Sequence, residues 1–224
     1  MATRITEHYF EFGGMKYFRE NAHNVEMCSY GEKKDPIGPK GYLDVQNKVQ
    51  AEHLEGRVKF NTRTGINWNE TTKAEVEAEG VFKFFSLGKA AAVNGSHEKA
   101  KEAKLELLSF AIDEGPLKTM LNKDASGARN YLAEEGNDGR IVSEVWIVVD
   151  AELGQHFATY GSASASVQAA GSSVNVTVSG GKHGSQTVTL SRGTTFAYKL
   201  HKVKDWNKGK TQIENLEADY KGWQ

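Results

Sequence analysis

Apolar and polar residues alternate along residues 57–68, which is the period-two pattern of a β-strand with one buried face. The alternation returns after a polar turn at residues 69–72 and leads into an apolar run at residues 81–85. Both arms carry charged residues on their polar side. The sequence therefore predicts a long amphipathic β-hairpin over residues 57–85.

The period then changes, because apolar residues recur at helical spacing over residues 96–114 and the pattern ends at Gly115 and Pro116. This spacing predicts a helix over that segment. Two shorter helices are predicted over residues 117–122 and 128–135. Together these elements form a helical block between two sheet-forming regions.

The most apolar stretch, residues 141–153, predicts a central β-strand. Residues 155–169 then alternate with a period of two but use very small side chains. Residues 173–179 continue the alternation up to a glycine-rich turn at residues 180–184, and together they predict a second hairpin. A last pair of strands is predicted over residues 186–190 and 194–203.

These elements predict an α+β fold class, with a twisted, mainly antiparallel sheet, long amphipathic hairpins and an inserted helical block. The 224 residues suffice for one large domain, to which we assign residues 1–203. Residues 204–224 form a polar tail, either a docked helix or a frayed end. The apolar anchors that would dock the tail on the sheet are Trp206, Ile213, Leu216, Tyr220 and Trp223.

Composition narrows the class of protein. Charged residues make up 25% of the chain and hydrophobic residues 38%, so the chain is not of the disordered class. The 28 basic side chains are balanced by 29 acidic ones, and we expect no nucleic-acid partner. No stretch reaches the roughly 18 apolar residues of a membrane helix, and the N-terminus lacks the pattern of a signal peptide. With Cys28 as the single cysteine, the simplest predicted location is the cytoplasm.

The sequence lacks the common motifs of catalysis, phosphate binding and metal binding. It has no GxxxxGKS or GxxxxGKT loop, no GxSxG motif in a strand-to-helix setting, and no close metal-binding spacing among its seven histidines. We therefore predict no catalytic residue, no metal and no cofactor. One enzymatic alternative stays open, in which residues meet only in the folded chain, with His23, Cys28 and nearby carboxylates as candidates.

The two predicted hairpins suit either of two environments. Their arms have about the 9 to 11 residues that a tilted membrane strand requires. In an ordinary antiparallel sheet, the apolar face packs on a core. In an oligomeric barrel the same face meets lipid, while the polar face lines a water-filled lumen. The alternation alone does not decide between these environments.

The order of the elements and the local sequences within them also resemble those of a known protein family. The chain carries LLSFAIDEGPLKTMLNKD, then LAEEGNDGRIVSEVWIVVDAEL, then the small-residue hairpin, and then SQTVTLSRGTTFAYKLHKV. This order resembles the pore-forming domain of the gasdermin family over residues 49–203. In that family a strand similar to IVSEVWIVVDAEL precedes the second membrane hairpin, and a strand similar to TVTLSRGTTFAYKL closes the domain.

The resemblance implies a cytoplasmic protein that relocates to acidic phospholipid membranes, forms a homo-oligomer and inserts two β-hairpins per subunit. Such pores cause cell death or act in defence. The large inhibitory C-terminal domain of animal members has no counterpart in residues 204–224, a length similar to the tails of compact microbial and fungal members. The tail is then either an inhibitory peptide that a protease removes or a plain terminus on a protein controlled by a partner.

Membrane recognition by such a protein rests on basic side chains that meet anionic lipid. The lipid-binding candidates are Arg57, Lys59, Arg63, Lys73, Lys83, Lys199, Lys202 and Lys204. The membrane-inserting candidates are Val58, Phe60, Ile66, Trp68, Ala163, Ala165, Val167, Val174, Val176 and Val178. The substitution Val176→Asp is expected to abolish leakage and to leave the soluble fold intact. The alternative function is a non-enzymatic, β-rich binding or assembly module of the cytosol, in which the same hairpins are static sheet.

Overall fold

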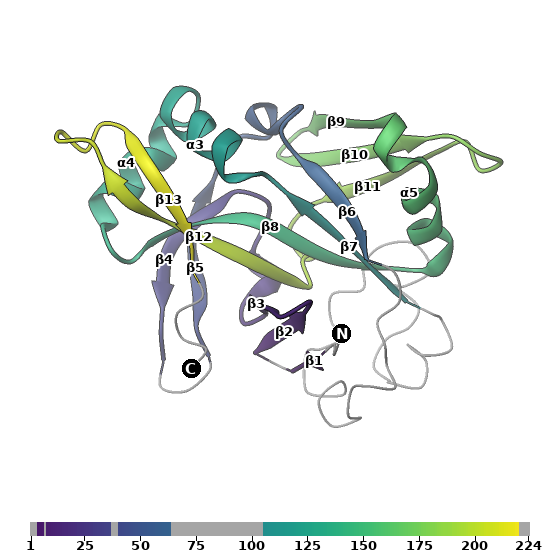
Figure 1. Cartoon of the computed structure of the whole chain (residues 1–224), viewed down its shortest axis with the longest axis horizontal. Coiled ribbons are helices and arrows are strands. Elements are labelled where there is room, and N and C mark those ends of the chain that lie inside the picture. The colour runs from purple at the N-terminus through teal and green to yellow at the C-terminus, as the bar shows by residue number, and fades with distance from the viewer. Residues whose placement is uncertain (1–3, 7, 37–39, 64–104, 220–224) are drawn as a thin grey trace.

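The computed structural model describes residues 4–6, 8–36, 40–63 and 105–219, which form a ten-stranded sheet, a three-stranded sheet and three α-helices (Figure 1). The strands are β1 (Arg4–Ile5), β2 (Tyr9–Phe12), β3 (Met15–Phe18), β4 (Ser29–Lys34), β5 (Tyr42–Lys48), β6 (Lys59–Arg63), β7 (Glu106–Ala111), β8 (Gly139–Val149), β9 (Ala165–Ala170), β10 (Ser173–Ser179), β11 (Ser185–Leu190), β12 (Ala197–Trp206) and β13 (Ile213–Ala218). The helices are α3 (Glu114–Lys123), α4 (Ser126–Glu135), α5 (Ala151–Ser164) and the short 3-10 helices η1 (Ala22–Asn24) and η2 (Ala51–Leu54). All strand pairs of the described residues are antiparallel, which confirms the predicted α+β class with a mainly antiparallel sheet.

Two long strands, β8 and β12, pair with each other at the centre of the ten-stranded sheet. On its outer edge, each of these two strands pairs with one strand along part of its length and with another strand along the rest. β8 pairs first with β4 and then with β7, while β12 pairs with β3 at Tyr198 and with β13 from His201 onward. The sheet therefore divides into two halves that share β8 and β12, with β6 and β7 in one half and β4, β5 and β13 in the other (Figure 1).

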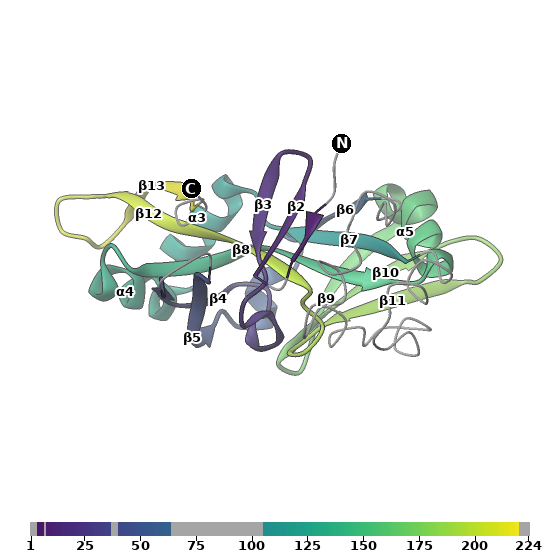
Figure 2. The same cartoon turned by 90° about the horizontal axis from the view of Figure 1, so that it is seen from below.

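β8 is apolar along almost its whole length because both of its faces are buried. Val145 and Ile147 belong to the larger core, to which α3, α4 and α5 contribute side chains. Trp146 and Val148 belong to a second core, formed with aromatic residues of β2 and β3. Figure 2 shows α3 and α4 at one end of the molecule, and α5 with β9, β10 and β11 at the other.

The predicted helix over residues 96–114 is wrong in its described part. Residues 106–111 are strand β7, which lies between β6 and β8, and helical conformation begins only at Glu114. Both faces of β7 are buried, since Leu107 belongs to the second core and Leu108 to the larger one. A strand buried on both faces is apolar at nearly every position, and such a run also satisfies a helical spacing.

The predicted strand over residues 155–169 is also wrong before Ala165, because α5 occupies this segment. The helix begins at its N-cap, where Asp150 Oδ1 accepts a hydrogen bond of 2.9 Å from the backbone N–H of Leu153. Small side chains fit a helix as well as a strand. The cap and the buried Phe157 on the inner face of α5 favour the helix in this structure.

Several predicted elements are confirmed. α3 and α4 occupy the helices predicted over residues 117–122 and 128–135, and β8 is the predicted central strand, although it ends at Val149. β10, β11 and β12 lie where strands were predicted, but β11 pairs with β10 rather than with β12. Of the predicted first hairpin, β6 is present, and residues 64–85 lie outside the described part of the chain.

The tail is neither a docked helix nor a frayed end over its described residues. It forms β13, which pairs with β12. Ile213 and Leu216 are buried in the larger core, and Trp206 packs against that core. Tyr220 and Trp223, the other two predicted anchors, lie outside the described residues.

A buried ion cluster joins the end of this tail to the main sheet. The side chain of Asp219 is fully buried, with Oδ2 2.6 Å from Arg140 Nε and 3.3 Å from Lys33 Nζ. The backbone N–H of Asp219 donates to the carbonyl oxygen of Leu200 in β12 at 2.9 Å. The boundary expected before Lys204 falls inside β12, so the strand runs on across it.

Candidate functional site

Four neighbouring strands, β6, β7, β8 and β12, begin or end together at one end of the larger sheet. β6 ends at Arg63, close to the start of β7 at Glu106, and Glu106 lies opposite Val149, the last residue of β8. β12 starts at Ala197, which lies opposite Trp146 of β8. The end of β6, the start of β7, the end of β8 and the start of β12 therefore lie together at this end of the sheet.

The chain between β8 and β12 folds as α5 followed by the three-stranded sheet (Figure 1). The two faces of this sheet differ in character. On one face Val176 lies between Val167 of β9 and Val188 of β11. On the other face Thr177 lies opposite Thr187, and their hydroxyl oxygens are 2.8 Å apart. The sheet is thus amphipathic, with one aliphatic and one hydroxyl-rich face.

Helix α5 packs between this small sheet and strands β6 and β7. The ring of Phe157 meets the rings of Phe60 and Phe110 edge to face, with centroid distances of 5.5 and 6.3 Å. Towards β10, His156 is buried and its Nε2 donates to the carbonyl oxygen of Val178 at 3.1 Å. α5 is therefore held by aromatic packing on one side and by a buried hydrogen bond on the other.

Two glycines allow α5 to approach β6 and β7 closely. A Cβ on Gly154 would lie 2.0 Å from Glu106 Oε2, and a Cβ on Gly161 would lie 1.8 Å from Cζ of Phe60. Because the two glycines are seven residues apart, they share one face of the helix. The sequence prediction missed this contact, although the spacing of the glycines and the single glutamate in the apolar run of β7 were its visible signals.

Most of the membrane-inserting candidates in the second hairpin share the aliphatic face. Val174, Val176 and Val178 are buried on β10, and the cross-strand register places Val167 and Ala165 of β9 beside them. Val167 is half-buried and Ala165 is exposed. The register of β9 and β10 therefore places on one face the residues that the alternation of the sequence assigns to one face.

The remaining membrane-inserting candidates are separated from that face. Val58 is buried just before β6, and Phe60 is half-buried beneath α5. Ala163 belongs to α5 and not to a strand, which corrects its predicted place in a hairpin arm. Ile66 and Trp68 lie outside the described residues.

Three of the lipid-binding candidates form ion pairs with acidic side chains. Arg57 and Lys59 reach acidic residues at the two ends of α3, whereas Lys202 pairs across β12 and β13. The ion pairs are Arg57 with Asp124, Lys59 with Asp113, and Lys202 with Glu217. On β12, Lys199 is half-buried and Lys204 is exposed. Lys73, Lys83 and the side chain of Arg63 lie outside the described part of the chain.

Cys28 and His23 do not form a nucleophile and base. Cys28 is completely buried, and burial raises the pKa of its thiol to about 12, so the thiolate is disfavoured. His23 is exposed, and its Nε2 lies 2.9 Å from the side-chain nitrogen of Asn24. This pair therefore offers no accessible reactive thiolate.

The structure brings together a different pair that the sequence did not indicate, Ser143 of β8 and His201 of β12. Their side chains meet between the two central strands, with Nδ1 of His201 2.7 Å from Oγ of Ser143. The exposed fractions are 2% for Ser143 and 6% for His201, so a substrate cannot reach the hydroxyl. The pair links the two strands and is not an active site.

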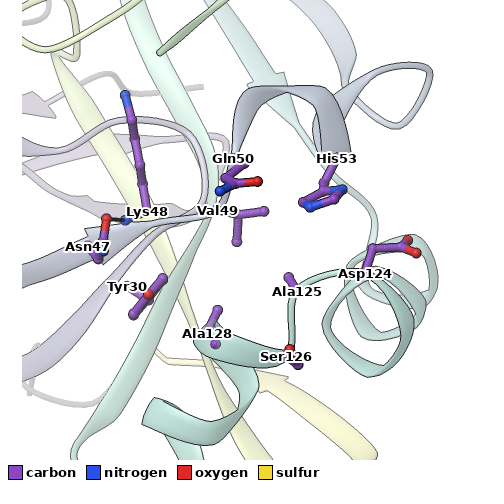
Figure 3. A pocket seen from close by; sticks show the side chains of 11 residues that line it. Tyr30, Asn47, Lys48, Val49, Gln50, His53, Asp124, Ala125, Ser126 and Ala128 are labelled. Carbon is purple, nitrogen blue, oxygen red and sulfur yellow. Dashed lines mark hydrogen bonds between the residues drawn. The ribbon is translucent and has the colours of Figure 1, made fainter.

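A polar pocket of about 320 Å³ lies between η2, the end of β5 and the N-terminus of α4 (Figure 3). Gln50, His53 and Ser126 line it, together with the backbone at the start of α4. Asp124 on its rim is paired with Arg57. None of its lining residues belongs to β6, β7, β8 or β12, so the pocket is separate from the strand ends at which the chain leaves the sheet.

Comparisons with known proteins leave the function to be argued from this geometry. No protein-family model matches the chain, and neither the curated proteins nor the solved structures contain a match. Among the described residues, no helix is both long enough and apolar enough to cross a bilayer. Within the same residues, no three His, Cys, Asp or Glu side chains converge as a metal site.

Proposed function

We propose that the protein forms membrane pores, as its resemblance to the gasdermin pore-forming domain implies. On an acidic membrane, the chain between β8 and β12 extends into a β-hairpin that crosses the bilayer, and the chain between β6 and β7 supplies a second hairpin. Several subunits assemble so that the hairpins close into a barrel, because an open sheet edge is not tolerated in lipid.

A shared strand register is the observation that carries this proposal. In the β8 and β12 pair, Trp146 lies opposite Ala197, and in the β9 and β10 pair, Ala165 lies opposite Val178. The β9–β10 pair and the β8–β12 pair from Trp146 to Glu144, up to the register shift after Lys199, are centred on the same turn, at residues 171–172. The two pairs are therefore separate parts of one hairpin register, although they belong to different sheets in this structure.

The segments between these two paired regions have equal length, residues 147–164 on one arm and residues 179–196 on the other. If α5 unfolds, the turn at residues 180–184 opens and β11 separates from β10, the two segments can pair directly. The β8–β12 and β9–β10 registers then do not have to shift. Each arm beyond the larger sheet then exceeds the roughly 9 to 11 residues that a tilted strand needs to cross a bilayer. The period-two alternation of residues 155–169, which α5 does not use, supports this extended form.

The two faces of the extended hairpin suit lipid and water. Val174, Val176 and Val178 continue the aliphatic face, which α5 and the rest of the core cover in the present structure. Asn175 and Thr177 continue the opposite face, whose hydroxyl and amide groups suit a water-filled lumen. Because β7 already pairs with β8, the two hairpins would emerge side by side.

Dye release from vesicles tests the proposal. The full chain is added to vesicles that contain acidic phospholipid and to neutral vesicles, at low and high salt. We expect release from the acidic vesicles that weakens at high salt, because counterions screen the attraction to the lipid surface.

The variant Gly161→Ala makes the test independent of an unknown trigger. Its added Cβ collides with the ring of Phe60, so α5 docks less firmly and release is expected to be faster than from the wild type. A matched control is Gly127→Ala in α4, where no described residue lies within 4 Å of the new Cβ. Absence of release from both the wild type and Gly161→Ala on acidic vesicles would contradict pore formation and favour the static β-rich module.

A further inference from the structure

Two carboxyl groups lie at the joint where β7 begins, β8 ends and α5 starts. Glu106 is the first residue of β7, opposite Val149, and the next residue of the chain after Val149 is Asp150, the N-cap of α5. Oε2 of Glu106 is buried and has no hydrogen-bond partner among the residues that the structure describes. It lies against Gly154 of α5, where a Cβ would be only 2.0 Å away.

The surroundings of this carboxyl group disfavour its ionised form. Burial, and after it the negative charge of Asp150, raise the pKa of Glu106 above its usual value. The neighbouring residues Val149 of β8 and Gly154 of α5 carry no charge. On α5, Glu152 is exposed and its Oε1 lies 3.7 Å from Nδ1 of His183.

The other strand packed beside β7 is β6. Its last residue, Arg63, is paired in register with Leu107, and the side chain of Arg63 lies outside the described residues. Lys59, at the far end of β6, pairs with Asp113 and not with Glu106. Asp150 is thus the charged neighbour that the described residues place at this joint.

We infer that Glu106 is a proton-controlled latch for α5, which holds the helix on β7 when it is protonated and loosens it when it is ionised. The inference rests on the proposed function for its biological meaning, because the release of α5 is the step that frees the second hairpin. It adds a regulatory residue to that step, at the joint of both predicted hairpins.

The direction of the pH effect follows from the change in environment. In the docked state the carboxyl group binds its proton more tightly than it does in water, and after α5 leaves it is solvated and has its usual pKa. Docking is therefore fully stable below the usual pKa and weakens as the pH rises through the raised value. Neutral pH permits release, and acid opposes it.

Hydrogen exchange in solution tests the latch without any membrane. The backbone amides of α5 are followed at pH 7 and near the usual glutamate pKa of 4.5, with the amides of β8 as an internal reference. In Glu106→Gln the charge is removed and the shape kept, so we expect α5 to be protected several-fold more than in the wild type at pH 7. At the acidic pH the difference should shrink, because the wild-type carboxyl group is then largely protonated.

Two further variants separate the latch from general effects. Glu106→Leu removes both the charge and the unpaired oxygen, and α5 should again gain protection at pH 7. Glu152→Gln removes an exposed carboxylate from the same helix, and no gain is expected. Equal protection of α5 in the wild type, Glu106→Gln and Glu106→Leu at pH 7, or a gain that is the same at both pH values, would overturn the latch.

The outcomes for the latch and for the pore are distinguishable. A gain of protection in Glu106→Gln without any dye release from the wild type or Gly161→Ala would support the latch and contradict the pore. Dye release with unchanged exchange in the Glu106 variants would support the pore and overturn the latch. If both are correct, Glu106→Gln slows dye release at pH 7.

Discussion

At the residue scale, we expect the buried imidazole of His201 to make the fold sensitive to acid. Burial, and then the charge of Lys199, lower the pKa of His201 from 6.5 to about 4. The folded protein therefore favours the neutral imidazole, and its stability is lost as the pH falls from 6.5 towards the lowered value.

We expect this histidine to reduce the free energy of unfolding by about 2 kcal/mol between pH 8 and pH 5. Urea denaturation of the wild type and of His201→Gln at both pH values measures the contribution, since the variant lacks the titrating group. The same pH dependence in both proteins would show that His201 is not responsible.

The buried carboxylate of Asp219 is the second residue with a large expected effect. Asp219→Ala leaves Arg140 and Lys33 buried without their shared partner, which should lower the free energy of unfolding by about 3 to 5 kcal/mol. Asp205→Ala is the matched control, because Asp205 is exposed and accepts one hydrogen bond, from the side chain of Asn215. Equal melting temperatures for the two variants would mean that the cluster contributes little.

Individual candidate residues were only partly predictable from the sequence. The aliphatic parity of Val174, Val176 and Val178 follows from alternation alone, because a strand repeats every two residues. Glu106 could not be identified in this way, because its proposed role depends on Asp150 and Gly154. These residues come close to Glu106 only when β7 and β8 have paired.

At the scale of elements, prediction succeeded where one periodicity dominates. β8 is a long aliphatic run, and α3 and α4 have helical spacing between clear breakers. β7 and α5 were missed for opposite reasons. β7 is buried on both faces and lacks alternation, whereas α5 alternates but is held as a helix by its N-cap and its packing on Phe60. β13 was missed because its strand pairing depends on β12.

The shared register makes a direct prediction about the extended hairpin. Ala158 of α5 and Ser185 of β11 are both exposed in this structure and are equidistant from the turn at residues 171–172. We expect the double variant Ala158→Cys with Ser185→Cys to form a disulfide on acidic vesicles, because the two cysteines then lie on opposite strands of one pair.

A pair shifted by one residue, Ala158→Cys with Gln186→Cys, is the matched control, and its cysteines would point to opposite faces of the hairpin. The natural Cys28 is buried and does not compete. Equal cross-linking of the two pairs, or none for the first pair on leaky vesicles, would contradict the register.

β13 also changes what is expected of the tail. A chain that ends at Lys204 loses β13, which pairs with β12. It also loses the buried Asp219, which pairs with Arg140 and Lys33. We expect this truncation to destabilise the fold at least as much as Asp219→Ala, measured by thermal unfolding. A truncated chain that melts like the full one and leaks faster would instead support a removable inhibitory tail.

At the scale of the whole molecule, the proposed rearrangement keeps a central body in place and changes the part of the chain between β8 and β12. The body is the central pair of β8 and β12 with two cores, one on each face. The part between β8 and β12 packs on this body through the small sheet, which contacts η2, and through α5, whose close fit depends on Gly154 and Gly161. Val176 is fully buried in the larger core, so Val176→Asp would destabilise the fold. This differs from the expectation from the sequence, in which the variant leaves the soluble fold intact.

Two adjacent residues of β9 give a cleaner test of the membrane-facing side. Ala165 and Ser166 are both exposed in this structure, so a charge at either position should leave the fold intact. In the extended hairpin Ala165 lies on the aliphatic face and Ser166 on the polar face. A charge is costly on the lipid side of a membrane strand and tolerated in the lumen.

Dye release from acidic vesicles by the wild type, Ala165→Asp and Ser166→Asp is therefore the measurement that tests pore formation most directly. The proposed pore predicts that Ala165→Asp loses release while Ser166→Asp keeps it, with equal thermal stability of the three proteins in solution. Equal release by both variants, or no release by any of the three proteins, would contradict insertion of this hairpin.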